Sequence, residues 1–134
     1  YKEQASYSDI IKFIKRVKLN KQKTIKFIKN NNKLGKKIFL YGASTKGNTL
    51  LQYYGLTNKE IPFASERTKT KWGKYTIGSG VKILSEEKAR KLNPDYFFVM
   101  PYGFIKEFIK REKKWLRSGG KFILPYPKFK VLKT

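Results

Sequence analysis

The fold is decided by residues 38–55, which read Ile38-Phe-Leu-Tyr-Gly-Ala-Ser-Thr-Lys-Gly-Asn-Thr-Leu-Leu-Gln-Tyr-Tyr-Gly55. The four apolar residues from Ile38 to Tyr41 are typical of a strand buried on both faces. Gly42 begins a turn of small residues, and from Lys46 onward apolar residues recur at helical spacing until Gly55, a glycine of the kind that ends helices. A buried strand, a glycine turn and a helix beginning on free backbone amides predict the opening unit of an α/β fold.

The composition indicates one globular domain without thiol or imidazole chemistry. Its 134 residues fit a single core, and 40% of them are hydrophobic, so disorder does not describe the chain. Cys and His are absent, which excludes disulfides, Cys/His zinc sites, Ser-His-Asp triads and Cys-His pairs. We therefore expect no metal site in this chain, and the lack of Cys fits a cytoplasmic protein.

The chain carries no sign of a membrane segment. No apolar run approaches the roughly 20 residues that span a bilayer, and the first residues, Tyr1-Lys-Glu-Gln4, do not resemble a signal peptide. We therefore expect no membrane partner. The chain also starts without Met, from which we expect it to be a fragment of a longer polypeptide.

The formal net charge of +23 has two interpretations. Of the 32 basic residues 27 are Lys, and they are spread along almost the whole chain instead of forming one cluster. Such a distribution is typical of a solvated surface with a biased composition. It also suits an anionic partner: a nucleotide-linked substrate, nucleic acid or the acidic surface of another domain.

Apolar runs alternate with helical patterns along the chain. A leading helix is predicted from Ser8, capped by Ser8 or Asp9, and it continues as one long helix or two shorter ones to the Asn residues before Gly35. Further helices are predicted over residues 46–54, after the N-cap Ser85, and over residues 104–117. Strands are predicted over residues 37–41, 61–65, 96–100 and 121–125, with a short strand or extended connection over residues 81–84.

This alternation predicts the fold class α/β. We expect a Rossmann-like three-layer sandwich, with a mostly parallel sheet of four or five strands, helices on both faces and a long N-terminal helix in front. The chain then divides into a leading helix over residues 1–35, the α/β domain over residues 36–127 and a basic tail over residues 128–134.

One edge of the predicted sheet gathers the candidate site. In open α/β sheets ligands bind outside the carboxyl ends of the strands. The expected ends there are Gly42-Ala43-Ser44, Ser65-Glu66-Arg67, Pro101-Tyr102 and Pro125-Tyr126.

The glycine turn Gly42-x-x-x-x-Gly47 is open to two interpretations. It lacks the middle glycine of the dinucleotide fingerprint and the Lys-Ser/Thr pair of a Walker loop. Free amides at a helix start attract an anion, and Lys46 and Asn48 would add donors. Alternatively, the glycines only permit a tight turn and close packing of strand on helix.

Residues 67–80, which follow Glu66, contain charge and aromatic rings in an irregular stretch. Glu66 lies about where the acid of a Rossmann fold contacts a ribose, although an acid at a strand end is often only solvated. The basic and aromatic residues after it either clamp phosphates and stack on a base or sugar, or form a mobile loop: Arg67, Lys69, Lys71, Trp72, Lys74 and Tyr75. No pair of carboxylates has a readable spacing for acid/base work, so no self-contained active site is visible and no catalytic residue is predicted.

Several motifs together resemble one family. They are Tyr41-Gly-Ala-Ser-Thr-Lys-Gly-Asn-Thr-Leu-Leu-Gln52, Ile61-Pro-Phe-Ala-Ser-Glu-Arg67, Lys71-x-Gly73-Lys74-Tyr75, Pro94-Asp95-Tyr96 and Gly119-Gly-Lys-Phe-Ile123-x-Pro125. The chain from residue 37 to residue 127 thereby resembles the C-terminal domain of S-adenosylmethionine-dependent sugar C-methyltransferases, which methylate nucleotide-linked sugars in deoxysugar biosynthesis. It departs from them at Thr68-Lys69, where Asn-Pro is expected, and at Ile77, where Pro is expected.

The resemblance implies a division of labour. A zinc-binding N-terminal module and a central S-adenosylmethionine domain would precede this domain, which would face the central domain, close over the nucleotide-linked sugar and be inactive in isolation. Zinc and S-adenosylmethionine would then bind to other parts of the full-length protein, and this domain would bind no cofactor. The residues implied to contact the substrate are Gly42, Ala43, Ser44, Lys46, Gly47, Asn48, Glu66, Arg67, Lys71, Gly73, Tyr75, Pro101 and Tyr102.

Two alternatives from other classes stay open. A stand-alone Rossmann module would bind a nucleotide such as NAD or coenzyme A through the same glycine turn. A nucleic-acid-binding protein would instead use the charge of +23, and its affinity would fall steeply with salt because counterions are released.

Overall fold

The computed structural model describes residues 6–100 and 105–133. Its helices are α1 (Tyr7–Lys33), α2 (Thr45–Tyr54), the 3-10 turn η1 (Lys69–Lys71), α3 (Glu86–Lys91), α4 (Ile105–Arg111) and α5 (Lys113–Arg117). Its strands are β1 (Ile38–Tyr41), β2 (Phe63–Glu66), β3 (Lys82–Ser85), β4 (Tyr96–Val99), β5 (Lys121–Leu124) and β6 (Lys130–Leu132). The opening unit predicted from residues 38–55 is confirmed, including Gly55 in the left-handed conformation at the end of α2.

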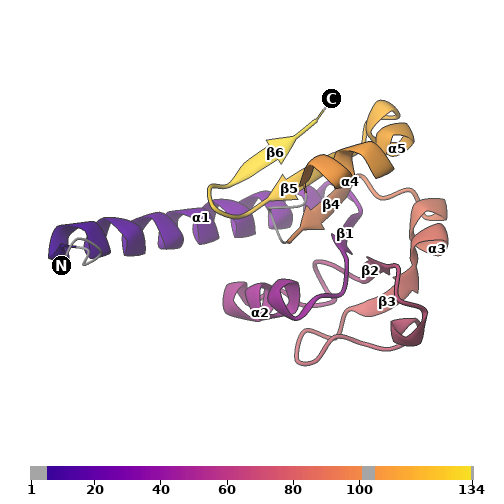
Figure 1. The fold of residues 1–134 in the computed structure, drawn as a ribbon, viewed down its shortest axis with the longest axis horizontal. Coiled ribbons are helices and arrows are strands. Elements are labelled where there is room, and N and C mark those ends of the chain that lie inside the picture. Colours follow the sequence, from indigo (N-terminus) through magenta and orange to yellow (C-terminus); the bar gives the residue numbers. More distant parts are fainter. Residues whose placement is uncertain (1–5, 101–104, 134) are drawn as a thin grey trace.

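The strands form one sheet in the order β3-β2-β1-β4-β5-β6 (Figure 1). The first five are parallel, whereas β6 pairs antiparallel with β5, so the predicted mostly parallel α/β sheet is confirmed. The predicted number of four or five strands is too low because part of the expected basic tail forms β6. There Val131 pairs with Ile123 and Phe129 packs on Phe27, which anchors a short Lys-rich segment that has little apolar pattern of its own.

Each face of the sheet is covered by helices. Alternate residues of β1 enter opposite cores: Ile38 and Leu40 pack toward α1 and α2, while Phe39 and Tyr41 pack toward α3, α4 and α5. Both β1 and β4 are buried along their whole length. This double burial explains why their sequences are continuous apolar runs instead of alternating ones.

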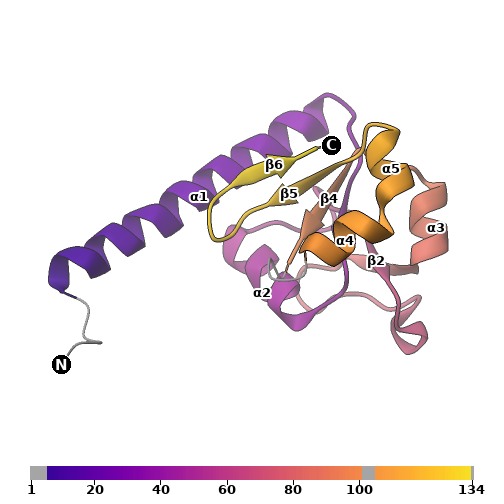
Figure 2. The same ribbon diagram turned by 45° about the horizontal axis from the view of Figure 1, so that its top comes forward.

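The leading helix is a single helix of 27 residues. Its N-cap is Ser6, whose hydroxyl accepts a hydrogen bond from the Asp9 amide at 3.2 Å, so the predicted caps Ser8 and Asp9 both lie inside the helix. The buried residues of α1 are Thr24 and Ile28, in its second half. Figures 1 and 2 show the first half extending beyond the sheet.

The connection from β2 to β3 contains no α-helix. Instead, residues 73–76 turn back beside β3: the Gly73 amide donates to the Ile83 carbonyl and the Ile83 amide to the Lys74 carbonyl, both at 2.8 Å. The side chains of Asn48 and Gln52 on α2 donate to the Ile77 carbonyl at 2.8 and 2.9 Å. The irregular stretch predicted from the sequence is therefore held on both sides by hydrogen bonds.

A buried carboxylate separates α4 from α5, which the sequence predicts as one helix. Glu112 is 1% exposed and accepts hydrogen bonds from the Tyr41 hydroxyl at 2.7 Å and from Arg90 at 2.7 and 2.9 Å. Burial by itself raises the pKa of Glu112, but the hydrogen bonds from Arg90 and Tyr41 outweigh it, so the pKa of this carboxyl lies below its ordinary value. Glu112 is therefore an ionised group inside the core, bound to β1 and α3.

Replacing this carboxylate tests its structural role. Glu112→Gln should lower the free energy of unfolding by about 3 kcal/mol at pH 7, because the buried charge pair with Arg90 would be lost and Arg90 would keep only the more distant Glu86. Urea unfolding of the two proteins measures the difference. The matched control is Glu87→Gln, which removes an exposed partner of Lys91 and should change stability by less than about 0.5 kcal/mol. Equal losses in the two variants would contradict this role.

Candidate functional site

A pocket of about 320 Å³ lies at the carboxyl edge of the sheet. It opens beside the ends of β1, β2 and β4, where the chain changes faces: α2 connects β1 to β2 on one face and α3 connects β3 to β4 on the other. This is the position at which open α/β sheets bind ligands. Five of the residues proposed from the sequence line it: Gly42, Ser44, Glu66, Arg67 and Lys71.

Ser65, which the sequence places at this edge without a substrate contact, also lines the pocket. The lining residues that were not predicted are Tyr41, Glu86, Met100, Glu107, Phe108 and Arg111. Met100 directly follows β4, so the edge rule points to it. Glu86, Glu107 and Arg111 come from helices whose orientation against the sheet has no local signal in the sequence.

The predicted loop of free amides is wrong at four positions. The Gly42 amide donates to the Ser65 carbonyl at 2.7 Å and the Ala43 amide to Glu66 Oε1 at 2.8 Å. The Gly47 amide donates to the hydroxyl of Ser44, the N-cap of α2, and the Asn48 amide to the Ser44 carbonyl, both at 3.0 Å. These amides are satisfied by the protein itself.

The geometry of the two glycines fits the packing interpretation of the turn. Gly42 has φ +85°, a conformation that residues with a side chain rarely adopt. A Cβ on Gly47 would lie 3.2 Å from Ser44 Oγ and 3.6 Å from the Leu40 side chain. The turn is therefore built for close contact between strand and helix.

Glu66 holds the turn after β1 through two backbone amides. Its Oε1 accepts from the Ala43 amide and its Oε2 from the Thr68 amide, each at 2.8 Å. Burial by itself raises the pKa of Glu66, but these amide hydrogen bonds and nearby Lys71 lower it below the ordinary value. Lys71 also donates to the Ala43 carbonyl at 3.3 Å, so β2 and η1 both close onto the turn.

The other predicted residues that the structure describes do not line this pocket. Asn48 is engaged by the Ile77 carbonyl and by the Ser79 hydroxyl, so it holds the 76–80 turn. Lys46 is exposed on α2. Tyr75 is 60% exposed and lies beside Lys82 at the edge of the sheet. Pro101 and Tyr102 lie outside the described residues.

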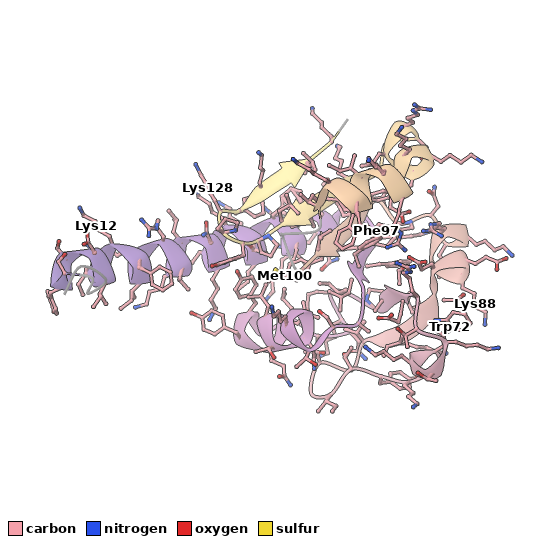
Figure 3. All side chains as sticks on the ribbon, in the orientation of Figure 1. Lys12, Trp72, Lys88, Phe97, Met100 and Lys128 are labelled. Atoms are coloured by element: carbon pink, nitrogen blue, oxygen red, sulfur yellow. The ribbon has the colours of Figure 1, made fainter. Side chains whose placement is uncertain are left out.

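A second hollow of about 830 Å³ adjoins the pocket. The two share Glu66, Arg67 and Glu86, and we call the pair the edge trough. Trp72 and Lys88 line the second hollow, at the end of the molecule that carries α3 (Figure 3). The Trp72 indole donates to the Glu66 carbonyl at 2.8 Å, which fixes the ring at the wall. Gly73 also lines this hollow.

The described part of the chain shows neither an acidic metal cluster nor a helix that could cross a membrane. Residues 6–100 and 105–133 contain no group of three or more Asp or Glu side chains placed to hold a metal ion. Within the same ranges, no helix is both long enough and apolar enough to cross a membrane.

The fold and the trough define an α/β domain that presents a pocket at the carboxyl edge of a mostly parallel sheet. Residues 2–127 match the family described as the C-methyltransferase C-terminal domain. The match covers most of the 134 residues, and the chain belongs to this family.

A curated relative supports the same assignment. The chain is 42% identical over 98 residues to the C-methyltransferase NovU of Streptomyces niveus. The alignment covers 73% of this chain and 23% of NovU, so the chain spans less than a quarter of the relative that it matches.

The carboxylate of Glu66 makes a pH-dependent contribution to stability. Because its pKa is lower in the folded chain than its ordinary value of 4.5, the contribution is complete above about pH 5 and is lost as the pH falls through the folded pKa. Glu66→Gln, which cannot accept from both amides, should be less stable than the parent by about 1–3 kcal/mol at pH 6. The difference in the free energy of unfolding between the two proteins should be smaller at pH 3 than at pH 6.

Urea unfolding of the parent and Glu66→Gln at the two pH values measures this gap. The other acidic residues are common to both proteins, so their titration cancels in the comparison. Glu87→Gln serves as the exposed control. A gap of equal size at pH 6 and pH 3 would show that the charge of Glu66 does not stabilise the turn.

Proposed function

We propose that this chain is the substrate-facing, Rossmann-like C-terminal domain of an S-adenosylmethionine-dependent C-methyltransferase that acts on a nucleotide-linked sugar in deoxysugar biosynthesis. The observation that carries the proposal is the position of the pocket. In this member of the family, the pocket lies at the carboxyl edge of the sheet, beside the turn after β1. The strand order β3-β2-β1-β4-β5 agrees with the doubly wound fold that binds nucleotides at this edge.

The trough offers the chemistry that a nucleotide-linked sugar requires. Arg67 and Lys71 supply positive charge for a diphosphate at the pocket. The ring of Trp72, 39% exposed, lines the adjoining hollow and provides a surface for a nucleobase or sugar. An elongated ligand that lies along both hollows would use all three residues.

The ionisation of the trough supports a binding role and not a catalytic one. A base that removes a proton needs a raised pKa, whereas the pKa of Glu66 is lowered. Burial, followed by the hydrogen bond to Glu112, raises the pKa of Tyr41 well above its ordinary value and keeps the hydroxyl protonated. As the family resemblance implies, we assign the proton transfer, the methyl donor and zinc to other parts of the full-length protein, with the central domain as the partner of this one.

Nuclear magnetic resonance tests the substrate site. Titration of the ¹⁵N-labelled chain with a thymidine diphosphate sugar should shift amide signals of residues 42–45 and 66–73, because these segments surround the trough. Signals from residues 7–17 of α1, remote from the trough, serve as the internal control. Shifts confined to other segments, or no shifts at millimolar ligand, would count against the proposal.

A methylation assay tests the division of labour. The isolated chain, incubated with S-adenosylmethionine and the same nucleotide sugar, should transfer no methyl group. The full-length enzyme from which the chain derives should do so under the same conditions. Turnover by the isolated chain would refute the assignment of catalysis to other domains.

A further inference from the structure

Arg111 is a cation of the pocket that the sequence analysis did not single out. It is the last residue of α4 and lines the pocket together with Gly42, Ser44 and Lys71. Its side chain is 28% exposed, and its guanidinium lies 5.8 Å from the centre of the Tyr41 ring. Arg111 therefore combines a fixed position with access from the pocket.

The partner of Arg111 is a carboxylate at the junction of the two hollows. The Arg111 guanidinium donates a hydrogen bond to Glu86, which begins α3 and lines both hollows of the edge trough. Arg67 lies at the same junction because it also lines both. An anion entering the trough there meets an arginine that is already paired.

Glu86 does not depend on Arg111 alone. Its Oε2 lies 3.6 Å from a guanidinium nitrogen of Arg90. Arg90 is itself held by two hydrogen bonds to Glu112 in the core, so its position is fixed independently of Glu86. If Arg111 turns away, Glu86 keeps a cation beside it.

The carboxylates of the pocket differ in how firmly they are engaged. Glu66 is committed to two backbone amides and cannot leave without opening the turn. Glu107 also lines the pocket and adds negative charge on the side of α4. Glu86 is the carboxylate paired with Arg111. An incoming phosphate can therefore replace Glu86 as the partner of that arginine.

We propose that Arg111 binds a phosphate of a nucleoside diphosphate and that Glu86 is its displaceable counter-ion in the empty pocket. This inference rests on the proposed function, since it names the residue that receives the diphosphate of the nucleotide-linked sugar. Arginine suits the role because its planar fork donates two parallel hydrogen bonds to phosphate oxygens. Exchange of a carboxylate for a phosphate preserves the charge pairing of Arg111 while Glu86 stays next to Arg90.

Calorimetric titration with thymidine diphosphate at low salt tests the exchange. Arg111→Gln should weaken binding about tenfold to a hundredfold, because a hydrogen-bonded charge pair is lost. Glu86→Gln should strengthen binding up to about fivefold, because the competing ion pair is removed. The matched control, Lys110→Gln, removes a charge from the adjacent exposed position of α4 and should change affinity less than about twofold.

Two companion measurements keep the test decisive. Arg111→Lys preserves the charge but not the planar fork, so its affinity should lie between those of the parent and of Arg111→Gln. If Arg111→Gln does not fold, Arg111→Lys and Glu86→Gln together test the proposal. Urea unfolding of each variant identifies a loss of structure. Pyrophosphate replaces thymidine diphosphate in a second series and should show the same order of variants.

The outcomes separate this inference from the proposed function. Thymidine diphosphate binding that is equally strong in Arg111→Gln and Lys110→Gln overturns the role of Arg111 and leaves the nucleotide-sugar domain standing. Binding of pyrophosphate with the predicted order, without any gain from the nucleoside, supports Arg111 and counts against the nucleotide part of the proposed function. Failure of both ligands to bind the parent chain overturns both.

Discussion

The structure depends on one ionised carboxylate in its interior. Glu112 accepts hydrogen bonds from Tyr41 at the end of β1 and from Arg90 on α3, so one buried charge connects the central strand with the helices of one face. A buried charge is tolerated only when it is paired, which fixes the position of Arg90. Arg90 also lies beside Glu86, and Glu86 accepts a hydrogen bond from Arg111 at the carboxyl edge. The ion pairs therefore continue from the core to the pocket. Core and pocket share one charge network.

The turn after β1 has the form of an anion-binding turn, but acceptors of the same chain already bind several of its backbone amides. The carboxylate of Glu66 receives the Ala43 amide, and Ser44 caps α2. Helix N-termini bind phosphate when such donors are open, so those occupied amides cannot hold the ligand as they do in dinucleotide-binding folds. If the pocket binds an anion as we propose, the side chains of Arg67, Lys71 and Arg111 supply the positive charge for it.

Local signals made the opening unit predictable, and distant contacts explain what was missed. An apolar run, Gly42 and Gly55 define β1 and α2 within 18 residues, and the edge rule then locates the pocket. The hydrogen bond from Asn48 to the Ile77 carbonyl joins residues 29 positions apart, so no local pattern predicts it. β6 was not predicted because three residues, one of them Lys, form too short a pattern to indicate a strand. Its pairing with β5 stabilises the strand. Arg111 and Glu86 meet only through the packing of α4 beside α3, which no periodicity encodes.

The net charge of +23 and the chemistry of the pocket act at different ranges. The helix α1 alone holds nine Lys and Arg residues against one Asp, whereas three cations of the pocket face three carboxylates: Glu66, Glu86 and Glu107. A compact diphosphate needs only one displaced ion pair and two or three cations, which the pocket can arrange around it. For the nucleoside diphosphate that we propose, the surface charge would speed the encounter and the cations of the pocket would bind the phosphates.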